Sequence, residues 1–231
     1  MDLAIITARG GSKRIPAKNL REFCGRPIIE YSIEAALDSR LFDCVMVSTD
    51  CENIARAAIA AGASVPFMRS AAASDDFATT SDVLVEVLNE LCVLGERYER
   101  FCCLYPTAPF ITSDLLKKAA RMLEASDADS VIPVVKYGFP PQRAFSMTDG
   151  FVSFLHPELS QRRSQDLDSI YHDCGQFYYC KTDSFLRHEN MVMPKTLAIE
   201  QPEILCQDID NEADWFIAEM KYRAAKERGL L

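Results

Sequence analysis

The sequence has no run of apolar residues that approaches the ~20 residues a helix needs to cross a bilayer. It has no recognisable secretory signal either, because Met1 leads straight into the apolar run at residues 3–6 without a basic segment. The nine cysteines are odd in number and form no Cys-x-x-Cys pair, and several lie in apolar runs where a thiol packs as a small hydrophobic group. We therefore expect a protein of the reducing cytoplasm with no membrane partner.

Two common nucleotide-binding motifs are also missing. The GxxxxGK[ST] spacing of the P-loop is absent, and no GxGxxG fingerprint follows the first apolar run, which argues against a hydride-transfer enzyme. No internal repeat, low-complexity stretch or long linker divides the chain. We therefore expect residues 1–231 to form a single domain.

The net charge of −9 comes from 25 basic and 34 acidic residues, so non-specific binding to nucleic acid is not expected. The net charge of the whole chain conceals an uneven distribution of charge along it. Residues 1–21 contain five Lys and Arg against Asp2 alone, a local balance of +4, whereas the remainder of the chain sums to −13. A cationic N-terminal segment in an otherwise acidic chain predicts one anion-binding site near the N-terminus.

Short apolar runs alternate with stretches in which apolar residues recur at helical spacing. The runs lie at residues 3–6, 44–47, 101–104 and 131–135, and the helical stretches at 27–39, 52–61, 81–94 and 113–125. This alternation predicts an α/β fold with a mostly parallel sheet. Pro133 cannot donate a backbone hydrogen bond, which favours an edge or bulged position for the fourth run.

The alternation stops after residue 135, and residues 138–172 are predicted to project from the sheet as a small lobe. Within this lobe Asp149-Gly150, flanked by apolar residues, predicts a β-hairpin. Regular structure is expected to resume at residues 176–179, and residues 211–228 to close the chain as a helix.

A glycine-rich cationic loop follows the first apolar run, at residues 8–19. Gly10 and Gly11 let the backbone approach a ligand closely and turn its N–H groups toward it. Arg9, Lys13 and Lys18 are together able to neutralise a polyanion of triphosphate size. A basic, solvated connecting loop is the alternative, but α/β sheets bind ligands directly beyond their buried parallel strands. We therefore interpret residues 8–19 as an anion-binding loop.

A second candidate site lies near the C-terminus, at Asp208 and Asp210. In extended backbone, residues two apart point to the same side, so the two carboxylates would face one point. Carboxylate pairs commonly hold Mg²⁺, with phosphate oxygens and water completing the coordination. The alternative is that Asp210 caps the final helix. The cationic loop at the other end of the chain favours the metal site.

A third group of polar residues spans residues 162–167 and 171–178, within and just after the predicted lobe. It mixes guanidinium groups, amides, an imidazole and aromatic rings, which suits recognition of an acidic, polyhydroxylated ligand. His172 fits a hydrogen-bonded structural histidine equally well, and the tyrosines fit packing against the sheet.

These segments together resemble one known family. Residues 8–13 and 15–19 look like the signature loop of the CMP-sugar synthetases for nine-carbon acids, the cytidylyltransferase family that includes the CMP-N-acetylneuraminic acid synthetases. Residues 47–50, 105–109 and 208–210 follow in the same order as in that family. The resemblance covers essentially the whole chain. It implies a Rossmann-like three-layer sandwich, similar to the nucleotide-diphospho-sugar transferases, with a small β-rich dimerisation excursion.

Two segments distinguish the members of this family that act on different sugar acids. Residues 163–167 and 172–178 resemble the members that act on pseudaminic acid, whereas sialic acid members typically carry Asn-Gly-Ala-Ile-Tyr in the second segment and Gln at the position of Tyr105. The resemblance therefore favours pseudaminic acid, with N-acetylneuraminic and legionaminic acids as alternatives. The alternative from another functional class is a protein module that binds CTP without catalysing a reaction. The intact Asp208, Asp210, Lys13 and Lys18 argue against it, because a sensor need not keep a metal pair.

The family implication is transfer of CMP from CTP to the anomeric hydroxyl of the sugar acid, with release of pyrophosphate. It assigns catalysis to Arg9, Lys13, Lys18, Asp208 and Asp210, of which the two aspartates would carry Mg²⁺. It assigns nucleotide binding to Ala8, Arg9, Gly10, Gly11, Ser12, Lys13, Lys18, Asn19, Arg69, Ser74 and Asp75. The candidates for the sugar are Tyr105, Gln142, Arg143, Arg163, Gln165, His172 and Gln176.

The family also implies a homodimer, in which the lobe at residues 138–172 reaches the cleft of the neighbouring subunit. The composition of the lobe is compatible with that role, because its phenylalanines and Leu155 are more than so short a hairpin can bury by itself. An isologous dimer is also the commonest soluble assembly.

Overall fold

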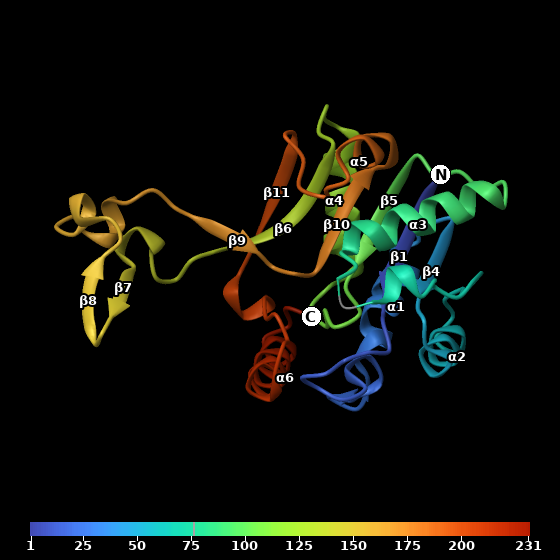
Figure 1. The fold of residues 1–231 in the computed structure, drawn as a ribbon, viewed down its shortest axis with the longest axis horizontal. Coiled ribbons are helices and arrows are strands. Elements are labelled where there is room, and N and C mark those ends of the chain that lie inside the picture. The colour runs from blue at the N-terminus through green and yellow to red at the C-terminus, as the bar shows by residue number, and fades with distance from the viewer. Residues whose placement is uncertain (76) are drawn as a thin grey trace.

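The central sheet has seven strands, with the path β11-β6-β10-β5-β1-β4 and with β9 paired to β6 (Figure 1). The computed structural model describes residues 1–75 and 77–231. The strands are β1 (Asp2–Thr7), β4 (Cys44–Ser48), β5 (Arg100–Leu104), β6 (Ser130–Lys136), β9 (Tyr171–Asp173), β10 (Phe177–Lys181) and β11 (Thr196–Gln201). The four predicted apolar runs are therefore strands, and β11 is a strand that the sequence pattern did not indicate.

The sheet is mixed but mostly parallel, as the alternation predicted. β1 pairs in parallel with β4 and β5, and β6 pairs in parallel with β11. β10 is inserted antiparallel between β5 and β6, and β9 is antiparallel to β6. The carboxyl ends of β1, β4 and β5 consequently lie together at one edge of the sheet.

Pro133 was expected at a sheet edge or a bulge, and the edge prediction is wrong. β6 lies inside the sheet, with β11 on one side. On its other side β10 pairs with Ser130 and Val131, and β9 takes over from Val134 to Lys136. Pro133 therefore sits where one neighbouring strand replaces another, and a backbone N–H is not required at that point.

Helices cover both faces of the sheet and make a three-layer sandwich. α1 (Ile28–Ser39), α2 (Glu52–Ala60) and α4 (Ser113–Glu124) pack on one face, whereas α3 (Thr80–Val93) and α5 (Thr182–His188) pack on the other. Successive residues of β1 point to opposite layers: Ala4 and Ile6 join the first core cluster, and Leu3 and Ile5 join the second. A strand covered on both faces reads as a continuous apolar run, which is why this pattern was visible in the sequence.

The predicted helices begin and end within about one residue of the observed ones. Gly62 and Gly95 follow α2 and α3 with φ of +95° and +86°, the left-handed conformation that favours glycine after a helix. α6 (Glu212–Glu227) is the final helix, and its N-cap is Asn211, whose side chain accepts from the N–H groups of Ala213 and Asp214. The alternative that Asp210 caps this helix is therefore wrong.

Between β6 and β9 the chain extends away from the sheet as an arm, drawn at the far left of Figure 1. It carries β7 (Phe145–Thr148) and β8 (Phe151–Phe154), which form the predicted hairpin. Asp149 and Gly150 both have positive φ, as a two-residue hairpin turn of this hand requires.

A third, smaller apolar cluster holds the two ends of the chain together. Ile15 from the N-terminal loop, Phe23 from the short hairpin β2 (Glu22–Phe23) and β3 (Arg26–Pro27), Phe110, Ile209 and Trp215 of α6 are all buried in it. Among the described residues, none of the helices is long and apolar enough to cross a bilayer.

Candidate active site

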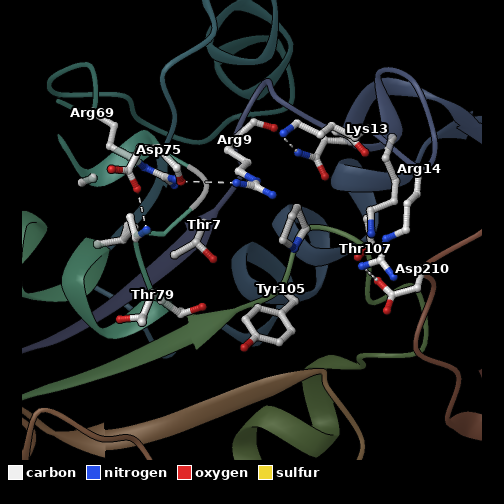
Figure 2. Close-up of a pocket in the computed structure, with 18 of the residues that line it drawn as sticks. Thr7, Arg9, Lys13, Arg14, Arg69, Asp75, Thr79, Tyr105, Thr107 and Asp210 are labelled. Carbon is white, nitrogen blue, oxygen red and sulfur yellow. Dashed lines mark hydrogen bonds and ion pairs between the residues drawn. The ribbon is translucent and has the colours of Figure 1, made fainter. Parts of the chain in front are cut away.

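A cleft of about 560 Å³ opens at the carboxyl edge of β1, β4 and β5, the edge at which open α/β sheets bind ligands. Its wall combines the end of β1, the N-terminal loop, the segment after β5, the start of α3, and the segment before α6. Figure 2 shows Arg9, Lys13 and Arg14 on one side of it and Thr79 and Tyr105 on another. The lining residues are Thr7, Arg9, Ser12, Lys13, Arg14, Lys18, Asn19, Arg69, Ala73, Asp75, Ala78, Thr79, Thr80, Val83, Tyr105, Pro106, Thr107, Asp208 and Asp210.

The N-terminal loop is held against the end of β4. Ala8 N donates to Ser48 O at 2.9 Å, and Gly10 N donates to Asp50 Oδ1 at 2.7 Å. The backbone of Gly10 lies so close to the next residue that an added Cβ would meet the Cβ of Cys51 at 2.9 Å. The first glycine is therefore required by a close approach within the protein itself, while an added Cβ on Gly11 would meet nothing within 4 Å.

Two cations of the loop reach the segment that carries the predicted metal ligands. Lys18 Nζ donates to Ile209 O at 2.6 Å, and Arg14 forms a 2.9 Å ion pair with Asp210 (Figure 2). Burial lowers the pKa of Lys18, although Asp210 and Asp208 act in the opposite direction. The sequence positions 14–18 and 208–210 thus form one site.

The carboxylates of Asp208 and Asp210 both line the cleft, as expected for residues two apart in extended backbone. Ile209 between them is fully buried in the third cluster, and this fixes the direction of its two neighbours. Burial raises the pKa of Asp208, and the negative charge of Asp210 raises it further. A cation bound between the two carboxylates would relieve that repulsion.

Arg69 and Asn19 form the polar floor of the cleft, and both are almost fully buried. The Arg69 guanidinium donates to Ser48 O at 2.6 Å and to Ser48 Oγ at 3.1 Å, and burial lowers its pKa. Asn19 Nδ2 donates to Arg9 O at 2.9 Å. Both side chains therefore also fix the backbone of the elements around them.

A wall of hydroxyl groups faces the cationic side of the cleft. Thr79, Thr80 and Tyr105 belong to it, and Thr107 extends it toward Asp210. Tyr105 is held through its backbone, since its N–H donates to Gln176 O at 2.9 Å and its carbonyl accepts from Ser32 Oγ at 2.7 Å. Figure 2 shows its ring between Thr79 and the Arg14–Asp210 pair in that view.

The structure does not bring most of the sugar-binding candidates to this cleft. Among the described residues, Tyr105 is the one member of that group that lines it. Gln142, Arg143, Arg163 and Gln165 belong to the arm, where Gln142 Nε2 donates to Asp168 O and Arg143 Nη1 to Ser164 Oγ. His172 is exposed at the base of the arm, with its ring 4.6 Å from that of Tyr137.

Two other predicted site residues, Gln176 and Ser74, form hydrogen bonds to backbone carbonyls within the protein and do not line the cleft. Gln176 is buried, and its Nε2 donates to Leu205 O at 2.6 Å, which ties β10 to the segment that leads to Asp208. Ser74 Oγ donates to Ser70 O at 2.7 Å and is not among the residues that line the cleft.

Sequence reasoning missed several cleft residues. Arg14 lines the cleft, but the sequence analysis counted it only in the charge of residues 1–21 and gave it no role. Asp50 lies outside the lining, and its role, accepting a hydrogen bond from Gly10 N, was missed too. The hydroxyl wall of Thr79, Thr80 and Thr107 was missed as well. The signal that marks Thr107 is its position directly after a buried parallel strand, because ligand-binding residues gather there.

This arrangement can bind a polyanion and a divalent cation side by side. Loop cations and backbone N–H groups suit phosphate oxygens. The described residues contain no cluster of three or more His, Cys, Asp or Glu with metal-binding geometry. A cation on Asp208 and Asp210 would therefore complete its coordination with ligand oxygens and water, as Mg²⁺ commonly does beside phosphates.

Comparison with known proteins is consistent with this geometry. The family model described as cytidylyltransferase matches residues 3–210. The pseudaminic acid cytidylyltransferase of Campylobacter jejuni subsp. jejuni serotype O:2 is 37% identical over 227 residues, which cover 98% of each chain. The CMP-N,N'-diacetyllegionaminic acid synthase of Legionella pneumophila is 32% identical over 228 residues and 94% of each chain.

A solved structure confirms the fold. The CMP:2-keto-3-deoxy-manno-octonic acid synthetase complexed with CTP aligns with a TM-score of 0.68 over 98% of this chain and 99% of that one, at 18% identity. The Rossmann-like three-layer sandwich is thus shared with a nucleotidyltransferase of different sequence.

Gly10→Ala should weaken CTP binding by about 10-fold, because relieving the contact with Cys51 displaces the loop backbone, and the loss of one charge-assisted hydrogen bond to phosphate is worth about that factor. Isothermal titration calorimetry with CTP measures the change. Gly138→Ala is the control: it lies outside the cleft, its added Cβ would meet Glu203 Oε2 at an ordinary 3.6 Å, and it should bind CTP as the wild type does. Equal affinity of the two variants would contradict the close-approach role of Gly10.

Proposed function

The chain belongs to the cytidylyltransferase family, and from this premise we propose that it transfers CMP from CTP to the anomeric hydroxyl of pseudaminic acid, giving CMP-pseudaminic acid and pyrophosphate. One observation carries the proposal: the cationic loop and the carboxylate pair, nearly 200 residues apart in sequence, line the same cleft. The identity of 37% and 36% to two enzymes named pseudaminic acid cytidylyltransferase, against 32% to the legionaminic acid synthase, supports this sugar acid.

The reaction breaks the bond between the α-phosphorus of CTP and the oxygen that bridges to the β-phosphate. The sugar hydroxyl oxygen forms the new bond to phosphorus and loses its proton, and pyrophosphate leaves. Such a transfer needs charge neutralisation and in-line placement more than covalent help from the protein. Arg9, Lys13 and Lys18 would bind the triphosphate, and Lys13 or Lys18 would counter the charge that develops on pyrophosphate. Asn19 and Arg69 would contact the nucleoside, with Asp75 nearby.

We propose Asp208 and Asp210 as the ligands of a magnesium ion. The donor set fits, because two hard carboxylates face one cleft beside the proposed phosphate site, and the pKa of Asp208 is raised by its burial first and by the charge of Asp210 second. When bound, Mg²⁺ supplies charge neutralisation at phosphate oxygens and acidifies a hydroxyl that it coordinates. Arg14, which pairs with Asp210 here, also lines the cleft and would pair with a phosphate instead once an ion binds Asp210.

The acceptor site is proposed to be completed by a second subunit. The arm carries the charged and amide side chains suited to a sugar acid, yet they lie outside the cleft of their own chain. The arm also exposes a large apolar surface, with Phe139 at 93%, Phe151 at 82% and Met147 at 74% exposure. A homodimer that brings residues 138–172 to the partner's cleft would bury this surface and deliver Gln142, Arg143, Arg163, Gln165 and His172 to the sugar.

Pyrophosphate release tests the reaction directly. With CTP and Mg²⁺, the protein should turn over pseudaminic acid with a higher kcat/KM than N-acetylneuraminic or legionaminic acid. Turnover with N-acetylneuraminic acid and none with pseudaminic acid would contradict the substrate. Binding of CTP without turnover of any of the three acids would favour a nucleotide-binding module instead.

Asp210→Asn should lower kcat by about 100-fold, because one of the two charged magnesium ligands is lost. The fold should persist, since the Arg14 pair that is removed is exposed. The concentration of Mg²⁺ needed for half-maximal rate should rise. Glu212→Gln removes the same charge two residues away, from an exposed pair with Arg21 outside the cleft, and should leave both quantities unchanged. Wild-type turnover of Asp210→Asn would rule out the metal role.

Phe151→Asp should raise the dissociation constant of the dimer by at least about 10-fold, because it places a charge on the apolar surface of the arm. Analytical ultracentrifugation over a concentration series measures this constant. Val93→Asp is the matched control, since Val93 is equally exposed, at 82%, but belongs to α3 on the main body. A wild-type protein that sediments as a monomer at micromolar concentration would contradict the shared site.

A further inference from the structure

The ion pair between Arg14 and Asp210 engages one of the two proposed metal ligands. Arg14 Nη2 donates to Asp210 Oδ1 at 2.9 Å, and both residues line the cleft. Figure 2 shows this pair at one side of the cleft and Asp75 at the other. A guanidinium this close to the carboxylate offsets the charge that attracts a divalent cation, and it also repels the cation directly. Arg14 and a cation therefore compete for Asp210.

The Arg14 side chain can leave Asp210 at little cost. The two side chains are 68% and 42% exposed, and ion pairs with that much contact with solvent contribute little to stability. The backbone on each side of the pair is held independently of it. Ile15, next to Arg14, is fully buried, and Asp210 N donates to Asp214 Oδ2 at 3.0 Å. Movement of the guanidinium therefore leaves both segments in place.

A triphosphate in the cleft would offer Arg14 a stronger partner. Arg14 belongs to the same loop as Lys13 and Lys18, which are proposed to bind the phosphates, and all three line the cleft. A guanidinium can form two parallel hydrogen bonds to a phosphate, which carries more negative charge than a carboxylate. Transfer of Arg14 from Asp210 to a phosphate would release the carboxylate just as phosphate oxygens become available to a cation.

We propose that Arg14 couples the two binding events: it holds Asp210 against a divalent cation until a triphosphate takes the guanidinium. This inference rests on the proposed function and deepens it, because it gives the site an order of binding. The protein alone has a low affinity for the metal ion, and the nucleotide raises it. Such coupling is reciprocal, so the cation also strengthens the binding of the nucleotide.

Arg14→Gln tests the effect on the metal ion in protein without nucleotide. With the guanidinium removed, Asp210 is available to a cation. The dissociation constant for Mn²⁺, used as a spectroscopic probe for Mg²⁺, should fall about 3- to 10-fold. Electron paramagnetic resonance of unbound Mn²⁺ measures this constant without turnover. An unchanged or larger constant would overturn the proposal.

The same variant should bind CTP more weakly in buffer that contains EDTA and no added metal. Arg14→Gln lacks a guanidinium partner for the triphosphate, so the dissociation constant for CTP should rise about 3- to 10-fold in isothermal titration calorimetry. Opposite changes for Mn²⁺ and CTP identify the exchange, because a variant that only distorted the loop would weaken the binding of both. Weaker binding of both ligands, or unchanged binding of CTP, would overturn the proposal.

Two other arginines provide controls matched in charge. Arg56→Gln removes the same charge from an exposed pair with Glu52 outside the cleft and should change neither constant. Arg9→Gln removes it from the same cleft, where Arg9 Nη1 donates to Asp75 O, and should leave the Mn²⁺ constant within about twofold. An Arg9→Gln protein that binds Mn²⁺ as tightly as Arg14→Gln would show a general charge effect and overturn the proposal.

Failure of the proposed function gives different results. A Mn²⁺ constant that Asp210→Asn leaves unchanged would reject the proposed metal site, and this inference with it. Absence of turnover with every sugar acid, together with the opposite changes expected for Arg14→Gln, would reject the proposed reaction alone.

Discussion

The third apolar cluster, which buries both Ile15 and Ile209, is the packing on which the cleft depends. Each isoleucine is fully buried, and each is flanked by charged residues that line the cleft: Arg14 beside Ile15, and Asp208 and Asp210 around Ile209. The burial of these two apolar side chains therefore fixes the direction of three charged ones, those of Arg14, Asp208 and Asp210. Lys18 strengthens the same junction through Ile209 O. Without this cluster, the cations and the carboxylates would belong to two unconnected surface loops.

Burial then gives the charges at this junction their chemical character. Lys18 and Asp208 are partly withdrawn from water, and burial is the largest cause of the pKa shift in each, downward for the lysine and upward for the aspartate. Both shifts favour the neutral form of the side chain, which means that holding these two charges in the cleft costs free energy. A phosphate beside Lys18 and a cation beside Asp208 would each remove part of that cost. The proposed site would therefore gain from binding a phosphate and a cation at the same time.

The sequence allowed the parallel part of the sheet to be predicted, because strands buried on both faces are continuous apolar runs and α2 and α3 end at glycines. It also placed the loop at residues 8–19 and the pair Asp208 and Asp210, since both depend on local spacing. It could not show that β10 enters antiparallel or that β6 is internal, because Pro133 is tolerated only through the exchange of β10 for β9.

The exchange of strands opposite Pro133 has a consequence for how such a protein diverges. The arm leaves from the end of β6 and returns as β9 on that same strand, with Val134 paired to Asp173. An insertion or deletion within the arm therefore changes neither the register nor the order of any other strand in the sheet. If the arm recognises the acceptor as proposed, acceptor recognition on this scaffold would be a replaceable module, and the proposed nucleotide site would be unaffected by its variation.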